Sequence, residues 1–461
     1  MPPRIVTISD HVDCPTGFGV QHRHLAAALA RAGFDVHSLG LWDTRPLGPT
    51  PEGAARYPGG LGPHDHRRAW PMYRELLRPD LVITLGDLES FAHLNDAPAR
   101  PFAWCHWLPL DALPYPSRHH ERLLRYDRLV LMSRFALELV RPHLEGHVPL
   151  HYIPHGVDPR VFRPHEDPPA LRQRWGRRLG LELRPDDFVL IARDANQWRK
   201  QPPVLLDALA RLPRDVKLLF HCHPVAHPAA NGWDLVHLAR DVYGVGDRVA
   251  FTSGPGAAPH AALAPEELAE LDSLADLRVS ATAGEGFGVV TLEAMACGTP
   301  TLITDYTTSR ELLLGRLEPR DTAAPVGVSW AGALPPADGG GEDAGHGGPA
   351  HIPDTAALGG ADGATAPPLR TPHSALRTEL DPFGPAGELV RVAAWTLEPR
   401  RHLFRPVPDA ADLAARVLAL RADPARRARY GVAGLRRALA HYTIERVARD
   451  WVALARQALA E

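Results

Sequence analysis

The chain has 461 residues, with 51 basic and 54 acidic side chains and a formal net charge of −3. This length supports two or more domains with large cores, and the balanced charge leaves no electrostatic footprint for nucleic acid. No apolar run approaches the ~20 residues of a membrane-spanning helix, and four scattered cysteines form no CxxC pair. We therefore expect a reduced, cytoplasmic protein whose membrane contact is at most peripheral, at the inner face, for example through the arginine-rich stretch 118–128.

The first third of the chain alternates short apolar runs with helical patterns. Residues 4–9 (RIVTIS) are typical of a buried parallel strand. A loop with Gly17 and Gly19 follows, then a helical pattern over 20–31 and a second strand over 35–39. This order is the signature of a doubly wound α/β sheet. Further strands are predicted over 81–85, 101–104, 129–132 and 151–154.

The same alternation starts again after a linker at 165–169. Strands are predicted over 188–192, 217–221, 248–252, 277–280 and 301–304, with helices over 204–211, 233–242, 266–275 and after Gly288. Two terminal helices are predicted, over 410–422 and from 425 onwards, the second broken near 441–443. We therefore predict an α/β protein with two Rossmann-like, doubly wound domains, 1–160 and 161–435, and a terminal helix in 436–461 that packs back on the first domain.

One segment differs from the rest in composition. Residues 337–372 are rich in Gly, Pro, Ala and Asp and poor in large apolar side chains. Such a segment cannot bury enough surface to offset its ordering entropy. We interpret it as a disordered insertion in the second domain.

The most informative segment is 284–300, GEGFGVVTLEAMACGTP. Gly286 and Gly288 permit a tight turn into a short helix over 289–296, whose free N–H groups and partial positive charge suit a phosphate. Glu285 and Glu293 can each accept two or more hydrogen bonds, as sugar diols require. The structural alternative is a capping glutamate followed by a surface glutamate on the helix.

Two glutamates separated by seven residues, within EGFGVVTLEAMACGTP, resemble the signature of the family 4 retaining glycosyltransferases (glycosyl transferases group 1). The resemblance covers most of the chain except 337–372 and much of 42–78. It implies a GT-B fold, with two domains facing across a cleft, and a nucleotide-diphosphate sugar as donor. It also implies that the backbone at Gly286, Phe287, Gly288 and Val289 faces the diphosphate, and that no other cofactor or metal is needed.

A cationic segment follows the strand 188–192. Arg193 stands at the strand's carboxyl end, where open α/β sheets bind ligands, and Arg199 and Lys200 follow shortly after. Fixed cations stabilise a departing diphosphate. In the family that the chain resembles, an arginine and a lysine here hold the diphosphate, which implies this role for Arg193 and Lys200, with Arg199 adjacent. Ordinary solvated charge is the alternative.

Two further features lie in the first domain. The loop Gly17-Phe18-Gly19 resembles the family's glycine loop, which closes over the donor phosphate and the acceptor, although a plain tight turn would also explain it. His106 is expected just past a strand end, on the cleft side, and resembles the family's active-site histidine that touches the sugar. A buried structural histidine is the alternative for His106.

Several histidines near Cys222 are candidate metal ligands. His221, His223 and His227 are close in sequence, but they lack a convincing ligand set. No Asp-x-Asp cation site occurs in the sequence. We therefore predict no metal site.

We predict from these features a retaining, metal-independent hexosyltransferase of bacterial carbohydrate biosynthesis, with His106, Glu285, Arg193 and Lys200 as its catalytic residues. The acceptor, the donor base and the oligomeric state are left open. The alternatives are a sugar-nucleotide epimerase of the same fold, a phosphorylase, and a non-catalytic protein that binds sugar nucleotides. Glu285, Glu293, Arg193 and Lys200, all present, argue against lost catalysis.

Overall fold

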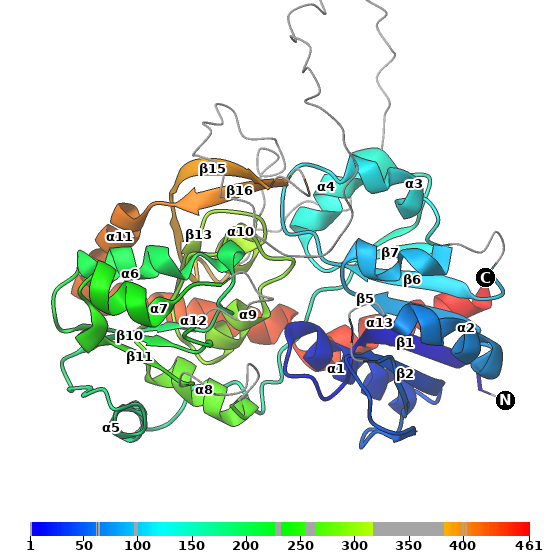
Figure 1. Cartoon of the computed structure of the whole chain (residues 1–461), viewed down its shortest axis with the longest axis horizontal. Helices are drawn as coiled ribbons and strands as arrows, with labels where there is room; N and C mark the ends of the chain where they lie inside the picture. Colours follow the sequence, from blue (N-terminus) through cyan, green and yellow to red (C-terminus); the bar gives the residue numbers. More distant parts are fainter. Residues whose placement is uncertain are drawn as a thin grey trace, which may run out of the picture.

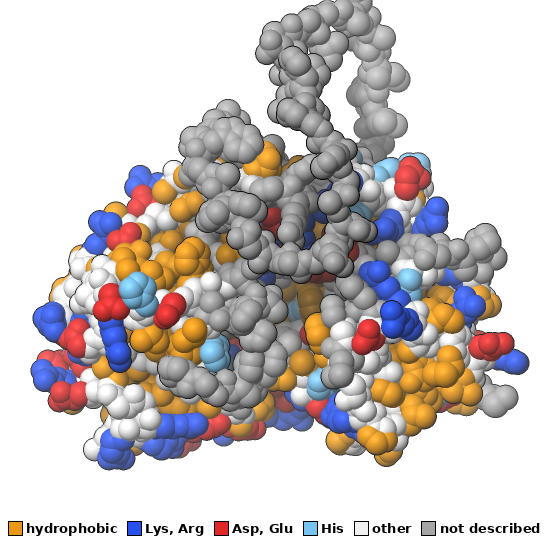
Figure 2. Space-filling view, viewed as in Figure 1, with side chains coloured by type: hydrophobic (Ala, Val, Ile, Leu, Met, Phe, Trp, Pro, Cys, Tyr) orange, Lys and Arg blue, Asp and Glu red, His pale blue; other side chains and the backbone are white. Residues whose placement is uncertain are grey.

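The computed structural model describes residues 2–60, 62, 65–95, 100–225, 232–253, 263–316, 382–398, 401 and 403–461. The predicted insertion 337–372 and His227 lie outside these residues. The chain folds into two α/β lobes (Figure 1). Basic and acidic side chains are interspersed over the face shown in Figure 2.

The first lobe is built on a sheet of order β3-β4-β2-β1-β5-β6-β7-β8. All neighbouring strands are parallel except β3 and β4. The strand order changes direction between β1 and β5, so the carboxyl ends of these two strands form the topological switch point of the sheet. The strands are β1 Arg4–Asp10, β2 Asp35–Leu41, β3 Gly48–Pro49, β4 Ala55–Pro58, β5 Leu81–Leu85, β6 Ala103–Leu108, β7 Arg128–Leu131 and β8 Leu150–Tyr152.

Helices cover both faces of this sheet. One of them, α13, comes from the far end of the chain and packs against α1 and β5 (Figure 1). The helices of this lobe are α1 Gly17–Arg31, α2 His66–Leu77, α3 His120–Leu123, α4 Arg134–Leu144 and α13 Ile444–Ala460, with 3₁₀ turns at Leu88–Asn95 and Ser117–His119.

The second lobe has a parallel sheet of order β11-β10-β9-β12-β13-β14, which reverses between β9 and β12. Its strands are β9 Phe188–Ala192, β10 Val216–Phe220, β11 Val249–Phe251, β12 Leu277–Ser280, β13 Thr301–Thr304 and β14 Gly387–Val390. Its helices are α5 Pro168–Leu179, α6 Pro202–Ala210, α7 Leu235–His237, α8 Pro265–Leu274, α9 Val289–Ala296, α10 Ser309–Leu314, α11 Ala410–Ala422 and α12 Pro424–His441, with 3₁₀ turns at Trp198–Lys200 and Gly246–Arg248 and a π-helical turn at Leu238–Val242. The prediction of two doubly wound α/β units is confirmed.

A two-stranded antiparallel hairpin belongs to neither sheet. Its strands, β15 Val392–Glu398 and β16 Leu403–Pro408, lie between β14 and α11 in sequence. In Figure 1 the hairpin extends from the second lobe towards the first. No pattern in the sequence predicted this hairpin.

The chain crosses between the lobes at two places that lie side by side. Val157, on the first crossing, forms a parallel bridge with Thr443, on the second. Gln21 of α1 exchanges two hydrogen bonds with the backbone of Gly156, at 2.8 and 3.0 Å. One apolar cluster contains side chains from both lobes, for example Ile5 and Leu292. The two lobes therefore share packed core and not only surface.

Two local differences from the sequence expectations affect the site. Helix α1 begins at Gly17 and not at 20, because Thr16 caps it by accepting a hydrogen bond from the Gly19 amide at 3.0 Å. The glycine loop is therefore the first turn of a helix. Strand β6 continues to Leu108, so His106 lies inside it. Among the described helices, none is long and apolar enough to cross a membrane.

Candidate functional site

The switch point of the second sheet brings two loops together. Lys200, at the end of the loop after β9, contacts the carboxylate of Glu285 in the loop after β12, and its ammonium lies 3.4 Å from Asp194. Arg199 donates a hydrogen bond to the carbonyl of Gly284. We call Lys200, Arg199, Glu285 and Asp194 the Lys200 cluster. It lies at the carboxyl ends of the strands, where an open α/β sheet binds its ligands.

Asp194 is the buried anchor of this cluster. Its carboxylate accepts a hydrogen bond from Ser280 at 2.6 Å and faces both Lys200 and Arg278. Burial by itself would raise the pKa of Asp194, but Lys200 and Arg278 outweigh burial and hold this pKa below its usual value. Asp194 therefore stays ionised and keeps the Lys200 ammonium in place.

A second cluster lies deeper in the lobe. The guanidinium of Arg193 contacts Asp272 of α8 and Glu293 of α9. The three side chains are 2%, 0% and 12% exposed, respectively. Burial raises the pKa values of both carboxyls, and attraction to Arg193 opposes that rise. We call these three residues the Arg193 cluster; in this structure Arg193 is enclosed by its two carboxylate partners.

The two predicted glutamates therefore lie in different clusters. Glu285 pairs with Lys200, and Glu293 pairs with Arg193. Arg278 of β12 connects the clusters, because its guanidinium lies 3.5 Å from Asp194 and it also acts electrostatically on Glu293. The two glutamates belong to one continuous charged network within the second lobe.

The turn 284–288, which includes Glu285, packs closely against the first lobe. Gly284 has φ +129°, and a Cβ added there would lie 1.9 Å from the carbonyl oxygen of Asp111. A Cβ on Gly286 would lie 2.7 Å from Pro109. Gly288 has φ +96° and caps α9, which spans Val289–Ala296 as the sequence predicts. Only glycine allows this turn and this close approach at Gly284.

Phe287 and Val289 have packing roles in this turn. The Phe287 ring is buried, and its centroid lies 5.5 Å from those of His155 and Tyr442. Val289 is partly buried and packs against the same apolar cluster, as does Phe18 of α1. The side chain of Phe287 therefore points into the core, and any contact of this residue with a ligand would come from its backbone.

The glycine loop of the first lobe has a similar packing explanation. Gly19 is buried, and a Cβ there would lie 2.4 Å from the carbonyl oxygen of Cys14. Gly17 is exposed, and a Cβ there would meet nothing within 4 Å. Thr16 also donates to Asp10 at 2.5 Å, which ties the loop to the end of β1. The turn lies at the switch point of the first sheet.

The expected position of His106, past a strand end and facing the cleft, is wrong. His106 is fully buried within β6, and its Nδ1 lies 2.7 Å from the hydroxyl of Thr84 on β5. Its ring stacks on Tyr126 at 4.8 Å and meets Phe91 edge-on at 5.6 Å. Burial lowers its pKa to about 3, so the imidazole is neutral. This side chain is enclosed in the core and does not line the Lys200 cluster.

The sequence reasoning missed Asp111, in the loop after β6. Its carboxylate lies 3.5 Å from Arg199 and 3.1 Å from Arg405 of the hairpin. Burial by itself would raise the pKa of Asp111, but Arg405 and Arg199 outweigh it and lower that pKa. Asp111 could have been found from its position shortly after a parallel strand, because residues at such positions lie at the ligand-binding edge of the sheet.

The histidines around Cys222 are used in local hydrogen bonds. His221 Nδ1 lies 2.8 Å from the hydroxyl of Thr252, and His223 Nδ1 lies 2.7 Å from the carbonyl of Val225. Within the part of the chain that the structure describes, no group of three or more His, Cys, Asp or Glu side chains is arranged to hold a metal ion.

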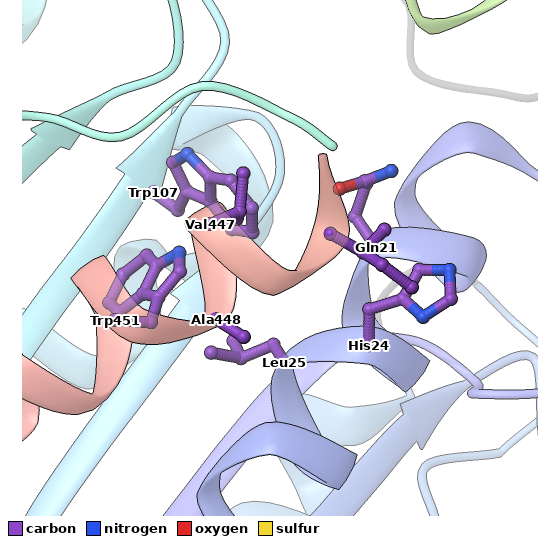
Figure 3. A pocket seen from close by; sticks show the side chains of 8 residues that line it. Gln21, His24, Leu25, Trp107, Val447, Ala448 and Trp451 are labelled. Atoms are coloured by element: carbon purple, nitrogen blue, oxygen red, sulfur yellow. The ribbon is translucent and has the colours of Figure 1, made fainter. Parts of the chain in front are cut away.

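A cavity lies between α1 and α13, away from these clusters (Figure 3). Its lining includes Gln21 and His24 from α1 and Trp451 from α13. The Trp107 side chain reaches it from β6. None of the residues that line it belongs to the Lys200 or Arg193 cluster.

Part of the second lobe is similar to a known family. Residues 185–323 match the family described as "Glycosyl transferases group 1". D-inositol 3-phosphate glycosyltransferases are similar to part of the chain. That of Mycobacterium marinum is 32% identical over 178 residues, 38% of this chain and 34% of the relative. That of Stackebrandtia nassauensis is 36% identical over 154 residues, 32% of this chain and 31% of the relative. The chain thus matches about a third of the length of these curated relatives.

Solved structures match the whole fold. Sucrose-phosphate synthase from Thermosynechococcus elongatus superposes with a TM-score of 0.68 at 19% identity, covering 99% of each chain. HepE of Anabaena, solved with UDP and glucose, gives a TM-score of 0.59 at 13% identity, covering 99% of this chain and all of that one. The fold is GT-B. The segment 185–323, which includes both charged clusters, is thus similar to the group 1 glycosyltransferases, and the described chain has the GT-B fold.

Proposed function

We propose that this protein is a retaining glycosyltransferase that moves a hexose from a nucleotide-diphosphate sugar to an acceptor held by the first lobe. One observation carries the proposal. Glu285 and Lys200 are in contact at the edge of the second sheet, beside the start of α9 and inside the segment that matches the family. A carboxylate for sugar hydroxyls and a cation for phosphate are thereby placed together.

The cations of the Lys200 cluster are the groups that would receive the diphosphate. Lys200 and Arg199 are 11% and 25% exposed, whereas Arg193 is 2% exposed. An arriving diphosphate can therefore pair with Lys200 and Arg199 without opening the core. These cations and the first amides of α9 would stabilise the charge that develops as the sugar departs. No step of this proposal requires a metal ion.

The two glutamates take different parts of the donor in this proposal. Glu285, on the turn that faces the first lobe, orients the hydroxyls of the hexose. Glu293 orients the ribose, with Arg193 fixing its carboxylate from behind. This assigns Arg193 to positioning Glu293, and Lys200 to direct contact with phosphate.

Retention of configuration follows from front-side attack. The acceptor oxygen attacks the anomeric carbon on the face that the diphosphate leaves, the bond from carbon to the diphosphate oxygen breaks, and that oxygen takes the acceptor proton. Asp111, the carboxylate that faces the turn from the first lobe, is engaged by Arg199 and Arg405. It is therefore a poor candidate for a covalent nucleophile, which favours the front-side route.

The donor is identified first, by calorimetry with UDP-glucose, ADP-glucose and GDP-mannose. UDP-glucose is the first probe because a structural neighbour, HepE, was solved with it. Acceptors are then screened with the tightest donor. Inositol 3-phosphate is included because the curated relatives are named for it. Transfer without loss of donor to hydrolysis or epimerisation is the expected outcome.

The site is tested with Glu285→Ala and the matched control Glu182→Ala, which changes an exposed glutamate paired with Arg184. Loss of one such transition-state contact costs about 10²–10³-fold in kcat. We expect that loss for Glu285→Ala, none for the control, and a retained anomeric configuration by NMR with EDTA present. Equal activity of the two variants, an inverted product or inactivation by EDTA would each contradict the corresponding part of the proposal.

A further inference from the structure

The hairpin β15–β16 reaches from the second lobe onto the first. The amide of Phe404 donates to the carbonyl of Leu113 at 2.6 Å. The hydroxyl of Tyr306 donates to the carbonyl of Phe404 and accepts from the amide of Leu113, both at 2.7 Å. Trp395 meets the Tyr306 ring edge-on at 5.2 Å, and both rings pack against the core of the first lobe. The hairpin is therefore docked on the loop that follows β6.

Arg405 of β16 lies at the centre of this contact. It is 1% exposed. One of its terminal nitrogens donates to the carbonyls of Asp111 and Ala283, at 2.9 and 3.2 Å. The other pairs with the Asp111 carboxylate at 3.1 Å, and Nε pairs with Glu398 at 3.1 Å. One guanidinium thus joins the first lobe, the turn before Glu285 and the hairpin.

The same guanidinium lies beside the close approach of Gly284 to the Asp111 loop. A Cβ on Gly284 would lie 1.9 Å from the Asp111 carbonyl and 3.0 Å from a terminal nitrogen of Arg405. Arg199 approaches from the other side, donating to the Gly284 carbonyl and lying 3.5 Å from the Asp111 carboxylate. Two arginines therefore clamp the Asp111 loop onto the turn that carries Glu285.

We propose that Arg405 is a positioning residue, through which a hairpin outside both sheets fixes the Asp111 loop of the first lobe against the Gly284 turn. The inference rests on the proposed function, because it assigns to the hairpin the alignment of the acceptor lobe with the donor site. The planar fork of arginine can serve two carbonyls and two carboxylates at fixed angles, which the single ammonium of lysine cannot do.

A purely structural role for Arg405 within the hairpin makes a different prediction. The ion pair with Glu398 lies inside the hairpin, whereas the bonds to Asp111 and Ala283 lie outside it. A structural role would require only a cation near Glu398, which Arg405→Lys supplies. A positioning role requires the fork, so Arg405→Lys should fail as Arg405→Gln does.

The experiment compares Arg405→Lys and Arg405→Gln with Arg391→Gln. Arg391 pairs with Asp409 at the exposed base of the same hairpin and serves as the matched control. For each full-length variant we would measure kcat and KM with UDP-glucose or whichever donor the screen selects. Calorimetric affinity for the free nucleotide, the melting temperature and hydrogen–deuterium exchange of peptides spanning 107–116 and 283–288 would be measured alongside.

We expect both Arg405 variants to lose about 10- to 100-fold in kcat, as a small misplacement of reacting groups does. Nucleotide affinity should change by less than about 3-fold, since its binding lies within the second lobe. Exchange should rise in 107–116 and 283–288 but not in β9 or β12. Wild-type kcat and exchange in Arg405→Lys would overturn the inference, as would exchange that rises throughout the second sheet.

The hydrogen–deuterium exchange measurements distinguish a failure of this inference from a failure of the proposed function. If the wild-type protein binds no sugar nucleotide and transfers nothing, the proposed function fails. Localised exchange in the Arg405 variants would then still support docking by the hairpin, and unchanged exchange would refute it. An active wild type with fully active Arg405 variants would refute the inference alone.

Discussion

The Lys200 and Arg193 clusters contain the two glutamates of one sequence motif, Glu285 and Glu293, respectively. The clusters differ in how exposed their side chains are. In the Lys200 cluster the cation is 11% exposed, and the turn beside it contacts the other lobe. In the Arg193 cluster the cation is 2% exposed and is enclosed by Asp272 and Glu293. Both contain a basic residue facing acidic ones, so the sequence presents them as equivalent.

This difference shows that two glutamates at a fixed spacing in one motif can have different roles. A pair at an open edge can exchange its partner for a ligand, since water and ligand can reach it. A sealed pair cannot lose a partner without leaving a charge buried. We therefore expect changes in the Lys200 cluster to act on catalysis, and changes in the Arg193 cluster to act first on folding.

The largest effect expected is on stability, from Arg193→Leu. This change leaves Asp272 and Glu293 buried without their cation, and loss of one partner of a buried pair costs about 3–5 kcal/mol. Lys200→Leu should cost less, because Arg278 remains near Asp194 and Arg199 remains near Glu285. Urea unfolding followed by circular dichroism measures both. Equal losses in the two variants would show that the clusters do not differ in the way their burial indicates.

A smaller but clear effect is expected on activity from Gly284→Ala. The new Cβ would overlap the Asp111 carbonyl, and the backbone there has φ +129°. Transfer should fall by about 100-fold, because the turn and the first lobe can no longer meet. Gly180→Ala is the control, since that glycine also has positive φ (+65°) but has nothing within 4 Å of an added Cβ. Similar activity in both variants would mean that the close contact is dispensable.

The smallest effect concerns pH and tests the corrected position of His106. Its folded pKa of about 3 lies below the 6.5 of an unperturbed histidine. Between these values the unfolded chain binds a proton that the folded chain does not. The contribution of His106 to stability is therefore present above pH 6.5 and is lost as the pH falls towards 3.

His106→Gln should accordingly lose less stability than wild type when the pH falls from about 8 to about 5. The comparison between variant and wild type removes the contribution of the other buried histidines. Urea midpoints at the two pH values measure the difference. A kcat that follows a group of pKa near 6.5 in wild type, and no longer does so in His106→Gln, would show that the imidazole is accessible after all.

Local patterns predicted much of the second lobe. Strand 188–192 and helices 289–296 and 410–422 have the predicted bounds. The signals that predict such bounds are glycine, proline and the spacing of apolar residues, and each of them lies within a few residues of the bound. Lys200 follows the carboxyl end of β9 as the sequence predicts, whereas its contact with Glu285 was not predicted. These features depend on short-range chemistry, which a single sequence displays directly.

Other parts of the site depend on contacts distant in sequence. Asp111 and Arg405 are 294 residues apart, and neither position carries a local signal of the other. The burial of His106 depends on where β6 ends and on Tyr126 and Phe91 closing over it. The partners of Arg193 come from α8 and α9, so its sequence position alone did not reveal that it would be enclosed.

The return of α13 to the first lobe has a consequence for how the protein is made. This helix packs on α1 and lines the cavity beside Trp107, and its final turn is followed by Glu461, which pairs with Arg128 of β7. During synthesis, the ribosome completes the first sheet long before it produces the helix that covers α1. The apolar side chains of α1 that α13 covers, such as Leu25 and Leu29, therefore stay uncovered by this helix until the second lobe has been translated.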